Sequence, residues 1–105
     1  MTREELLTET SRELADQGKL IEAGWVSMQL AMVPPDAPDV QVAEMRKAFM
    51  AGAQHLFSSI MAILDPGDDE PTEADLRRMD LISDELNAFY EEMTREARLK
   101  AGLER

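Results

Sequence analysis

The sequence has no cysteine and only one histidine, and these scarcities restrict the chemistry open to it. Without cysteine there is no disulfide, no thiolate nucleophile and no cysteine-based zinc site. Gly52 lies three residues before His55, so the Glu-x-x-His pattern of di-iron proteins is missing. No second histidine exists to complete a His-Glu-x-x-His motif. We therefore expect no catalytic residue, no metal site and no cofactor, and we expect that the protein is not an enzyme.

Proline is absent except in two short stretches, residues 34–38 and 65–71. A proline inside a helix removes a hydrogen bond and clashes with the preceding turn, so these stretches divide the chain into three segments. The segments have no strand-like alternation and no internal repeat. The prediction is an all-α single domain over residues 1–105, with three antiparallel helices at about 3–33, 37–64 and 72–100.

The first segment carries a helical apolar stripe that glycine interrupts. Thr2 and Glu5 have the spacing of a capping box at its start. Gly18 and Gly24 each cost about 1 kcal/mol relative to alanine in a helix. We expect a continuous helix or one kinked at Gly18, with a short turn there as the alternative. The stripe comprises Leu7, Leu14, Ile21, Trp25, Met28 and Met32.

The second segment is apolar on two faces. Asp36 can cap its start, and Pro38 is tolerated in a first turn. The residues around Gly52 are small, which favours close helix packing. From residue 48 to 64 the segment has no acidic or basic side chain apart from His55. A helix apolar nearly all round is buried nearly all round, so we expect a homo-oligomer, a dimer or higher. The candidate interface residues are Phe49, Met50, His55, Phe57 and Met61.

The third segment has a clear start, a single apolar stripe and a basic end. Thr72 and Asp75 have capping spacing, and the dipole at the other end favours basic side chains. Those side chains are Arg95, Arg98 and Lys100. The stripe comprises Leu76, Met79, Ile82, Leu86, Phe89 or Tyr90, Met93 and Ala97.

The charge of the chain is strongly acidic, with 22 acidic and 11 basic side chains and a formal net charge of −11. Such a field repels phosphates, so we expect no direct nucleic-acid binding. The acidic residues from Asp65 to Glu92 suggest an alternative, in which they imitate nucleic acid to inhibit a basic partner. The loop at Asp65 fails the calcium pattern because glycine occupies the third position.

The N-terminal residues lack the features of a signal peptide, and no apolar run reaches the ~18 residues of a membrane helix. We therefore expect a cytoplasmic protein that does not enter membranes. The partners we expect are a second copy of the chain, a host protein or a small nucleotide ligand.

Three stretches resemble small uncharacterised helical proteins encoded in phages and prophages of proteobacteria. These are Gly-Lys-Leu-Ile-Glu-Ala-Gly-Trp at 18–25, Pro-Pro-Asp-Ala-Pro at 34–38 and Ala-Phe-Met-Ala-Gly-Ala-Gln-His-Leu-Phe at 48–57. The resemblance spans most of the chain. It implies a phage accessory gene, and hence a non-enzymatic protein that acts by binding, self-associates through its central helix and inhibits a host defence or regulatory component.

A second resemblance is to phage helical-hairpin proteins that sequester cyclic-nucleotide immune signals. It rests on Ala-Phe-Met-Ala at 48–51, which opens a helix leading to another across a tight turn. This resemblance implies, as an alternative function, a sponge that holds a nucleotide between subunits. The basic residues expected near a phosphate do not follow Met50. Arg46 and Lys47 precede it, and Arg77 and Arg78 could approach from elsewhere in the chain.

Overall fold

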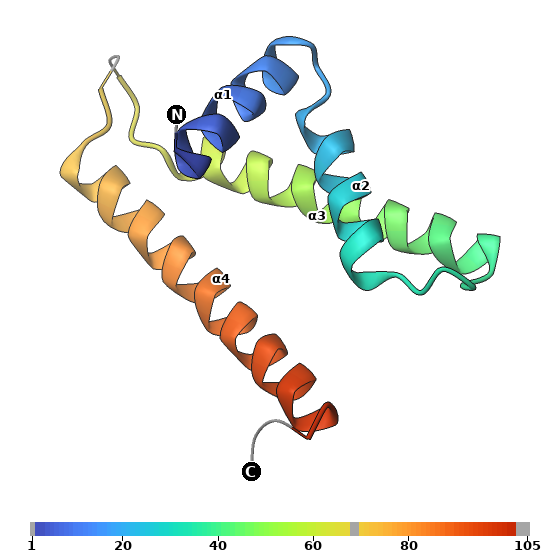
Figure 1. Ribbon diagram of the computed structural model, residues 1–105. Helices are drawn as coiled ribbons and strands as arrows, with labels where there is room; N and C mark the ends of the chain where they lie inside the picture. The colour runs from blue at the N-terminus through green and yellow to red at the C-terminus, as the bar shows by residue number, and fades with distance from the viewer. Residues whose placement is uncertain (1, 68–69, 103–105) are drawn as a thin grey trace. The chain divides into compact units, whose positions relative to one another are not determined.

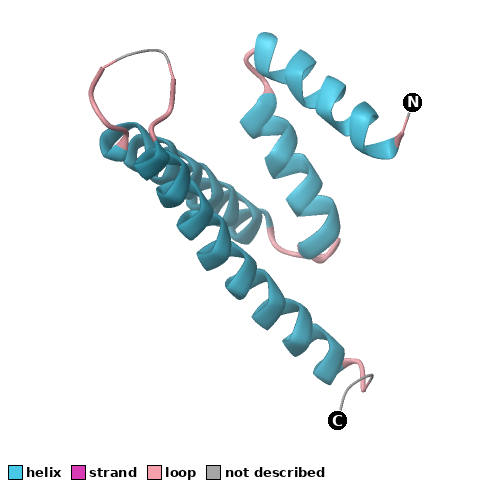
Figure 2. Cartoon of the chain, turned by 90° about the vertical axis from the view of Figure 1, so that its left-hand side faces the viewer, coloured by secondary structure: helices cyan, strands magenta, loops and turns pink. Residues whose placement is uncertain are grey.

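The computed structural model describes residues 2–67 and 70–102, and it confirms the all-helical prediction (Figures 1 and 2). The described residues form four helices and no strand. None of these helices is long and apolar enough to cross a membrane. The helices are α1 (Arg3–Asp16), α2 (Leu20–Met32), α3 (Asp39–Ile63) and α4 (Glu73–Lys100).

The prediction of one helix over residues 3–33 is wrong, because the chain turns at Gly18 and forms α1 and α2 instead. Gly18 has a φ of +70°, a left-handed conformation that glycine adopts without a steric penalty. Its N–H bonds to the Ala15 carbonyl at 3.0 Å, and the Lys19 N–H bonds to the Leu14 carbonyl at 2.8 Å. These two bonds form a Schellman motif, which ends a helix rather than kinking it.

The starts of α1 and α4 follow the predicted boundaries closely. Thr2 accepts a 3.1 Å hydrogen bond from the Glu5 N–H, and Thr72 with Asp75 forms a complete capping box. The second predicted helix begins later than expected, at Asp39. Asp36 does not cap it, since Asp36 lies in a turn that a hydrogen bond from the Ala37 N–H closes.

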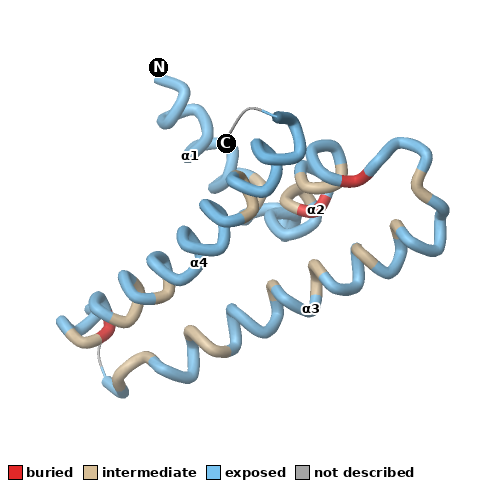
Figure 3. The backbone as a smooth tube through the Cα atoms, turned by 90° about the horizontal axis from the view of Figure 1, so that it is seen from below, coloured by how far each residue is buried: buried red, intermediate tan, exposed pale blue. Residues whose placement is uncertain are grey.

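The chain divides into two units, Met1–Ser59 and Ile60–Arg105, and α3 runs through the boundary between them. In the first unit Trp25 is 3% exposed and packs against Phe49 of α3, with ring centroids 5.9 Å apart and planes tilted by 51°. Glu22 of α2 and Arg46 of α3 form an ion pair between the same two helices. Trp25 and Val33 are the buried apolar residues of the described chain, and Figure 3 shows how few positions are buried.

Gly24 of α2 leaves space for the aromatic ring of Phe49. A β-carbon at Gly24 would lie 3.3 Å from Cζ of Phe49, whereas a β-carbon at Gly52 would meet nothing within 4 Å. Among the described residues, the glycine that permits a close helix approach is therefore Gly24 and not Gly52, which the sequence analysis favoured.

Candidate binding surfaces

The first unit has an apolar hollow between side chains of α2 and α3. Its volume is about 400 Å³. It is lined by Ile21, Met50, Ala53, Gln54 and Phe57. Met50 and Phe57 each lie three and four positions from Ala53 and Gln54, so the four residues from α3 share one face of that helix. Phe57 is 66% exposed and Ile21 is 47% exposed, so the hollow presents apolar carbon to its surroundings.

The five predicted interface residues have different environments. Phe49 is half-buried against Trp25, whereas Met50 and Phe57 line the apolar hollow. Met61 is 56% exposed and belongs to the second unit. His55 is also exposed. The structure thus brings Met50 and Phe57 together, and it assigns Phe49 a packing role within the chain.

His55 has a hydroxyl neighbour one helical turn further along α3. Its Nδ1 lies 3.4 Å from Oγ of Ser59, which is at the long limit of a hydrogen bond. Activation of a serine needs a base that a third group orients, and no acidic side chain bonds to this ring among residues 2–67 and 70–102. The pair can exchange a weak hydrogen bond along the helix.

The second unit contains a polar cluster that the sequence analysis missed, and we call it the loop clamp: Asp65, Thr72, Asp75 and Arg78. The buried carboxylate of Asp75 accepts hydrogen bonds from the backbone N–H groups of Asp65 at 2.9 Å and Thr72 at 3.1 Å. The Thr72 hydroxyl donates to Asp65 at 2.7 Å. Arg78 donates to Asp65 at 3.0 Å, to Asp75 at 3.1 Å and to the Ile63 carbonyl at 3.1 Å.

The clamp stabilises the ionised form of both its carboxylates. The pKa of Asp65 is lowered, first by the Thr72 hydroxyl and then by the hydrogen bond from Arg78. The pKa of Asp75 is lowered chiefly by the backbone N–H of Asp65. Asp65 therefore holds the connection between α3 and α4 in place. The sequence feature that could have indicated the loop clamp is Arg78, which lies one helical turn after Asp75 of the capping pair.

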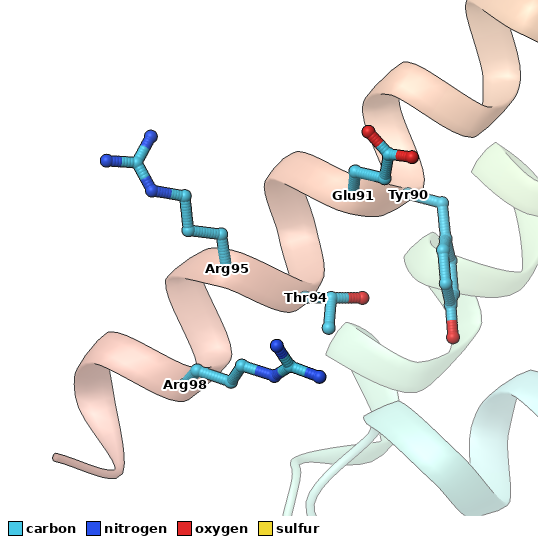
Figure 4. A pocket seen from close by; sticks show the side chains of 5 residues that line it. All are labelled: Tyr90, Glu91, Thr94, Arg95 and Arg98. Atoms are coloured by element: carbon cyan, nitrogen blue, oxygen red, sulfur yellow. The ribbon is translucent and has the colours of Figure 1, made fainter. Parts of the chain in front are cut away.

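A groove runs along the surface of α4 near its C-terminal end. It is lined by Tyr90, Glu91, Thr94, Arg95 and Arg98, and its volume is about 270 Å³. Figure 4 shows Arg98 extending alongside Thr94 on the side from which Tyr90 projects, whereas Arg95 turns away. Beside the aromatic ring the groove therefore presents the guanidinium group of Arg98, while Arg95 and the Glu91 carboxylate complete its lining. Arg78, one of two arginines that the cyclic-nucleotide resemblance left open for a phosphate contact, is held in the loop clamp.

No group of three or more metal-binding side chains gathers in the part of the chain that the structure describes. The features that bear on binding include the apolar hollow, the α4 groove and the exposed apolar side chains of the helices. No known protein family, no curated protein and no solved structure matches the chain.

Proposed function

We propose that this chain is a non-enzymatic binding protein of the phage accessory type that self-associates through the apolar face of α3. The observation that carries the proposal is the exposure of Phe57, 66%, in a hollow lined by Met50 and Ile21. Burying a side chain such as Phe57 contributes about 1.5–3 kcal/mol. If two copies cover each other's α3 face, each copy buries its own Phe57, so the dimer gains this contribution twice.

The small buried core supports the same proposal. A chain of this length has limited stability on its own, and association is a common way to bury further apolar surface. Each of the four helices carries exposed large apolar side chains, among them leucines on every helix. Where exposed apolar side chains gather, as Met50 and Phe57 do in the hollow, they are typical of interaction sites. In the setting that the phage resemblance implies, the associated protein inhibits a host defence or regulatory component.

Size-exclusion chromatography with light scattering tests the self-association. We expect a dimer or larger species, and we expect Phe57→Glu to shift it toward monomer. Leu30→Glu is the matched control, because Leu30 of α2 is 83% exposed and does not line the hollow. The proposal fails if the unmodified chain is a monomer at all concentrations, or if Phe57→Glu leaves the mass unchanged.

A second candidate function is sequestration of a cyclic nucleotide, and the α4 groove favours it. A base can stack on Tyr90, and Arg95 or Arg98 can pair with a phosphate. Ligand bound to the folded state raises the melting temperature, by an amount that grows with concentration. A thermal-shift panel of cyclic nucleotides, with Arg98→Ala as the comparison, tests this function. No shift at excess ligand would exclude it.

A further inference from the structure

The chain has eight methionines and one tryptophan but no cysteine, so its thioether groups are the side chains that a peroxide oxidises most readily. Trp25 is 3% exposed, which protects its indole. Met32 of α2 is 51% exposed, whereas Met50 of α3 is half-buried and lines the apolar hollow. One oxidisable methionine therefore lies in the surface that carries the proposed function.

The hollow gives a small peroxide access to Met50. Its volume of about 400 Å³ is many times the roughly 30 Å³ that a water molecule occupies in the liquid, and hydrogen peroxide is little larger than water. Phe57 also lines the hollow and is 66% exposed, so the hollow is open to solvent. Peroxide therefore enters the hollow of a single chain without any unfolding.

We propose that oxidation of the Met50 thioether by a peroxide prevents self-association through the apolar hollow. The sulfur bonds to one oxygen of hydrogen peroxide and the O–O bond breaks. The other oxygen takes up the proton of the first and leaves as water, so the sulfur loses two electrons and the peroxide gains two. The product is methionine sulfoxide. This inference rests on the proposed function, since it concerns the surface through which the chain self-associates.

A sulfoxide is compatible with an open hollow but not with a covered one. Oxidation turns an apolar side chain into a polar one, and water solvates its oxygen while the hollow is open. Ile21, Ala53 and Phe57 line the hollow and have no side-chain donor. Gln54 supplies a donor there, and one of its two N–H groups already bonds to Oγ of Ser58 at 3.0 Å. A covering copy would therefore bury a polar oxygen among mainly apolar groups, which weakens association by roughly tenfold or more.

Oxidation and association must oppose each other reciprocally, because each changes the equilibrium of the other by the same factor. A second copy over the hollow shields Met50, so the oxidation rate of Met50 should fall as the protein concentration rises. Met32 does not line the hollow, and its rate should stay constant. Peptide mass spectrometry after brief treatment with hydrogen peroxide measures both rates in one sample. Equal rates of Met50 oxidation at all concentrations would contradict the inference.

Light scattering after size-exclusion chromatography tests the effect on mass. We expect peroxide to convert the associated unmodified chain to monomer, and methionine sulfoxide reductases to restore the association. Met50→Leu keeps a side chain of similar volume that peroxide does not oxidise, so this variant should stay associated after the same treatment. Met32→Leu is the matched control and should dissociate as the unmodified chain does.

Trp25 fluorescence separates a local effect at the hollow from loss of the fold. Trp25 is buried against Phe49, so unfolding of the first unit would shift its emission to longer wavelength. We expect the oxidised chain to become monomeric while its emission and its helical circular dichroism remain unchanged. Dissociation that is accompanied by the emission shift would overturn the inference, because unfolding would then be the cause.

The outcomes distinguish the inference from the proposed function. If Phe57→Glu dissociates the chain but complete oxidation of Met50 leaves its mass unchanged, the inference fails and the proposed function stands. If peroxide dissociates Met50→Leu as fully as the unmodified chain, another methionine is responsible and the inference again fails alone. A chain that is monomeric before any treatment excludes both.

Discussion

The backbone N–H of Asp65 donates a 2.9 Å hydrogen bond to Oδ1 of Asp75, although the two residues lie on opposite sides of the loop that joins α3 to α4. The Thr72 N–H donates to the other carboxylate oxygen at 3.1 Å. One buried side chain thus closes the loop and caps the helix that follows it. Both oxygens of Asp75 must act as acceptors for this arrangement to persist.

Asp75→Asn should therefore lower the melting temperature of the chain by several degrees. An amide has one acceptor oxygen, and its NH₂ group would face a backbone donor, leaving a buried N–H without its partner. Asp80→Asn is the matched control, since Asp80 is exposed on the same helix. Thermal unfolding followed by circular dichroism makes the comparison. Equal melting temperatures for the two variants would show that the clamp contributes nothing to stability.

Acid should weaken the loop clamp in a definite pH range. The pKa values of Asp65 and Asp75 are lowered in the folded chain by the Thr72 hydroxyl and by the Asp65 N–H respectively. The folded state therefore binds fewer protons than the unfolded state, whose aspartates titrate near pH 3.9. The stabilisation is fully present above about pH 4 and is lost as the pH falls through the lowered pKa values.

Melting temperatures at pH 5, 4 and 3 measure this effect. Protonation of the many other carboxylates changes the melting temperature of the unmodified chain and of the Asp75→Asn variant by similar amounts. We expect the unmodified chain to lose more stability between pH 5 and pH 3 than Asp75→Asn does. Parallel pH profiles for the two chains would contradict the contribution of Asp75.

The sequence predicts the outer boundaries of the helical segments well because the ends of these segments carry local signals. The capping residues Thr2 and Thr72 fix two starts, and the prolines of residues 34–38 and 65–71 fix the breaks. Gly18 is also a local signal, but its effect on the helix depends on the hydrogen bonds that the neighbouring residues make. A glycine in a helical stripe can be tolerated or can end the helix, and only the bonds from Gly18 and Lys19 show that it ends α1.

The candidate sites are less predictable, since they depend on residues far apart in the sequence. The second segment has two apolar faces, and the pattern alone does not tell which of them meets α2. The structure selects Phe49 for that contact and leaves Phe57 exposed. The loop clamp has the same difficulty: the capping pair Thr72 and Asp75 is visible in the sequence, whereas the position of Asp65 beside Arg78 requires the folded loop.

Replacement of the helical glycines should separate helix propensity from packing. Gly52→Ala should raise the free energy of unfolding by about 0.5–1 kcal/mol, because the new β-carbon meets nothing within 4 Å. Gly24→Ala gains the same propensity, but its β-carbon lies 3.3 Å from Phe49 and must displace the ring. We expect Gly24→Ala to give no net gain or a loss. Urea denaturation measures both, and equal gains would show that Phe49 does not constrain Gly24.

The contact between Trp25 and Phe49 gives a direct optical test of the first unit. Trp25 is the only tryptophan and is 3% exposed, so its fluorescence reports on this site alone. Phe49→Ala removes the ring that lies 5.9 Å away and should cost about 2–3 kcal/mol, with a shift of the Trp25 emission to longer wavelength as water reaches the indole. Phe57→Ala, on the same helix but exposed, should leave the emission unchanged at low protein concentration. If the two variants shift the emission equally, then α2 does not pack on Phe49, and the case for Phe57 as the outward face of α3 fails with it.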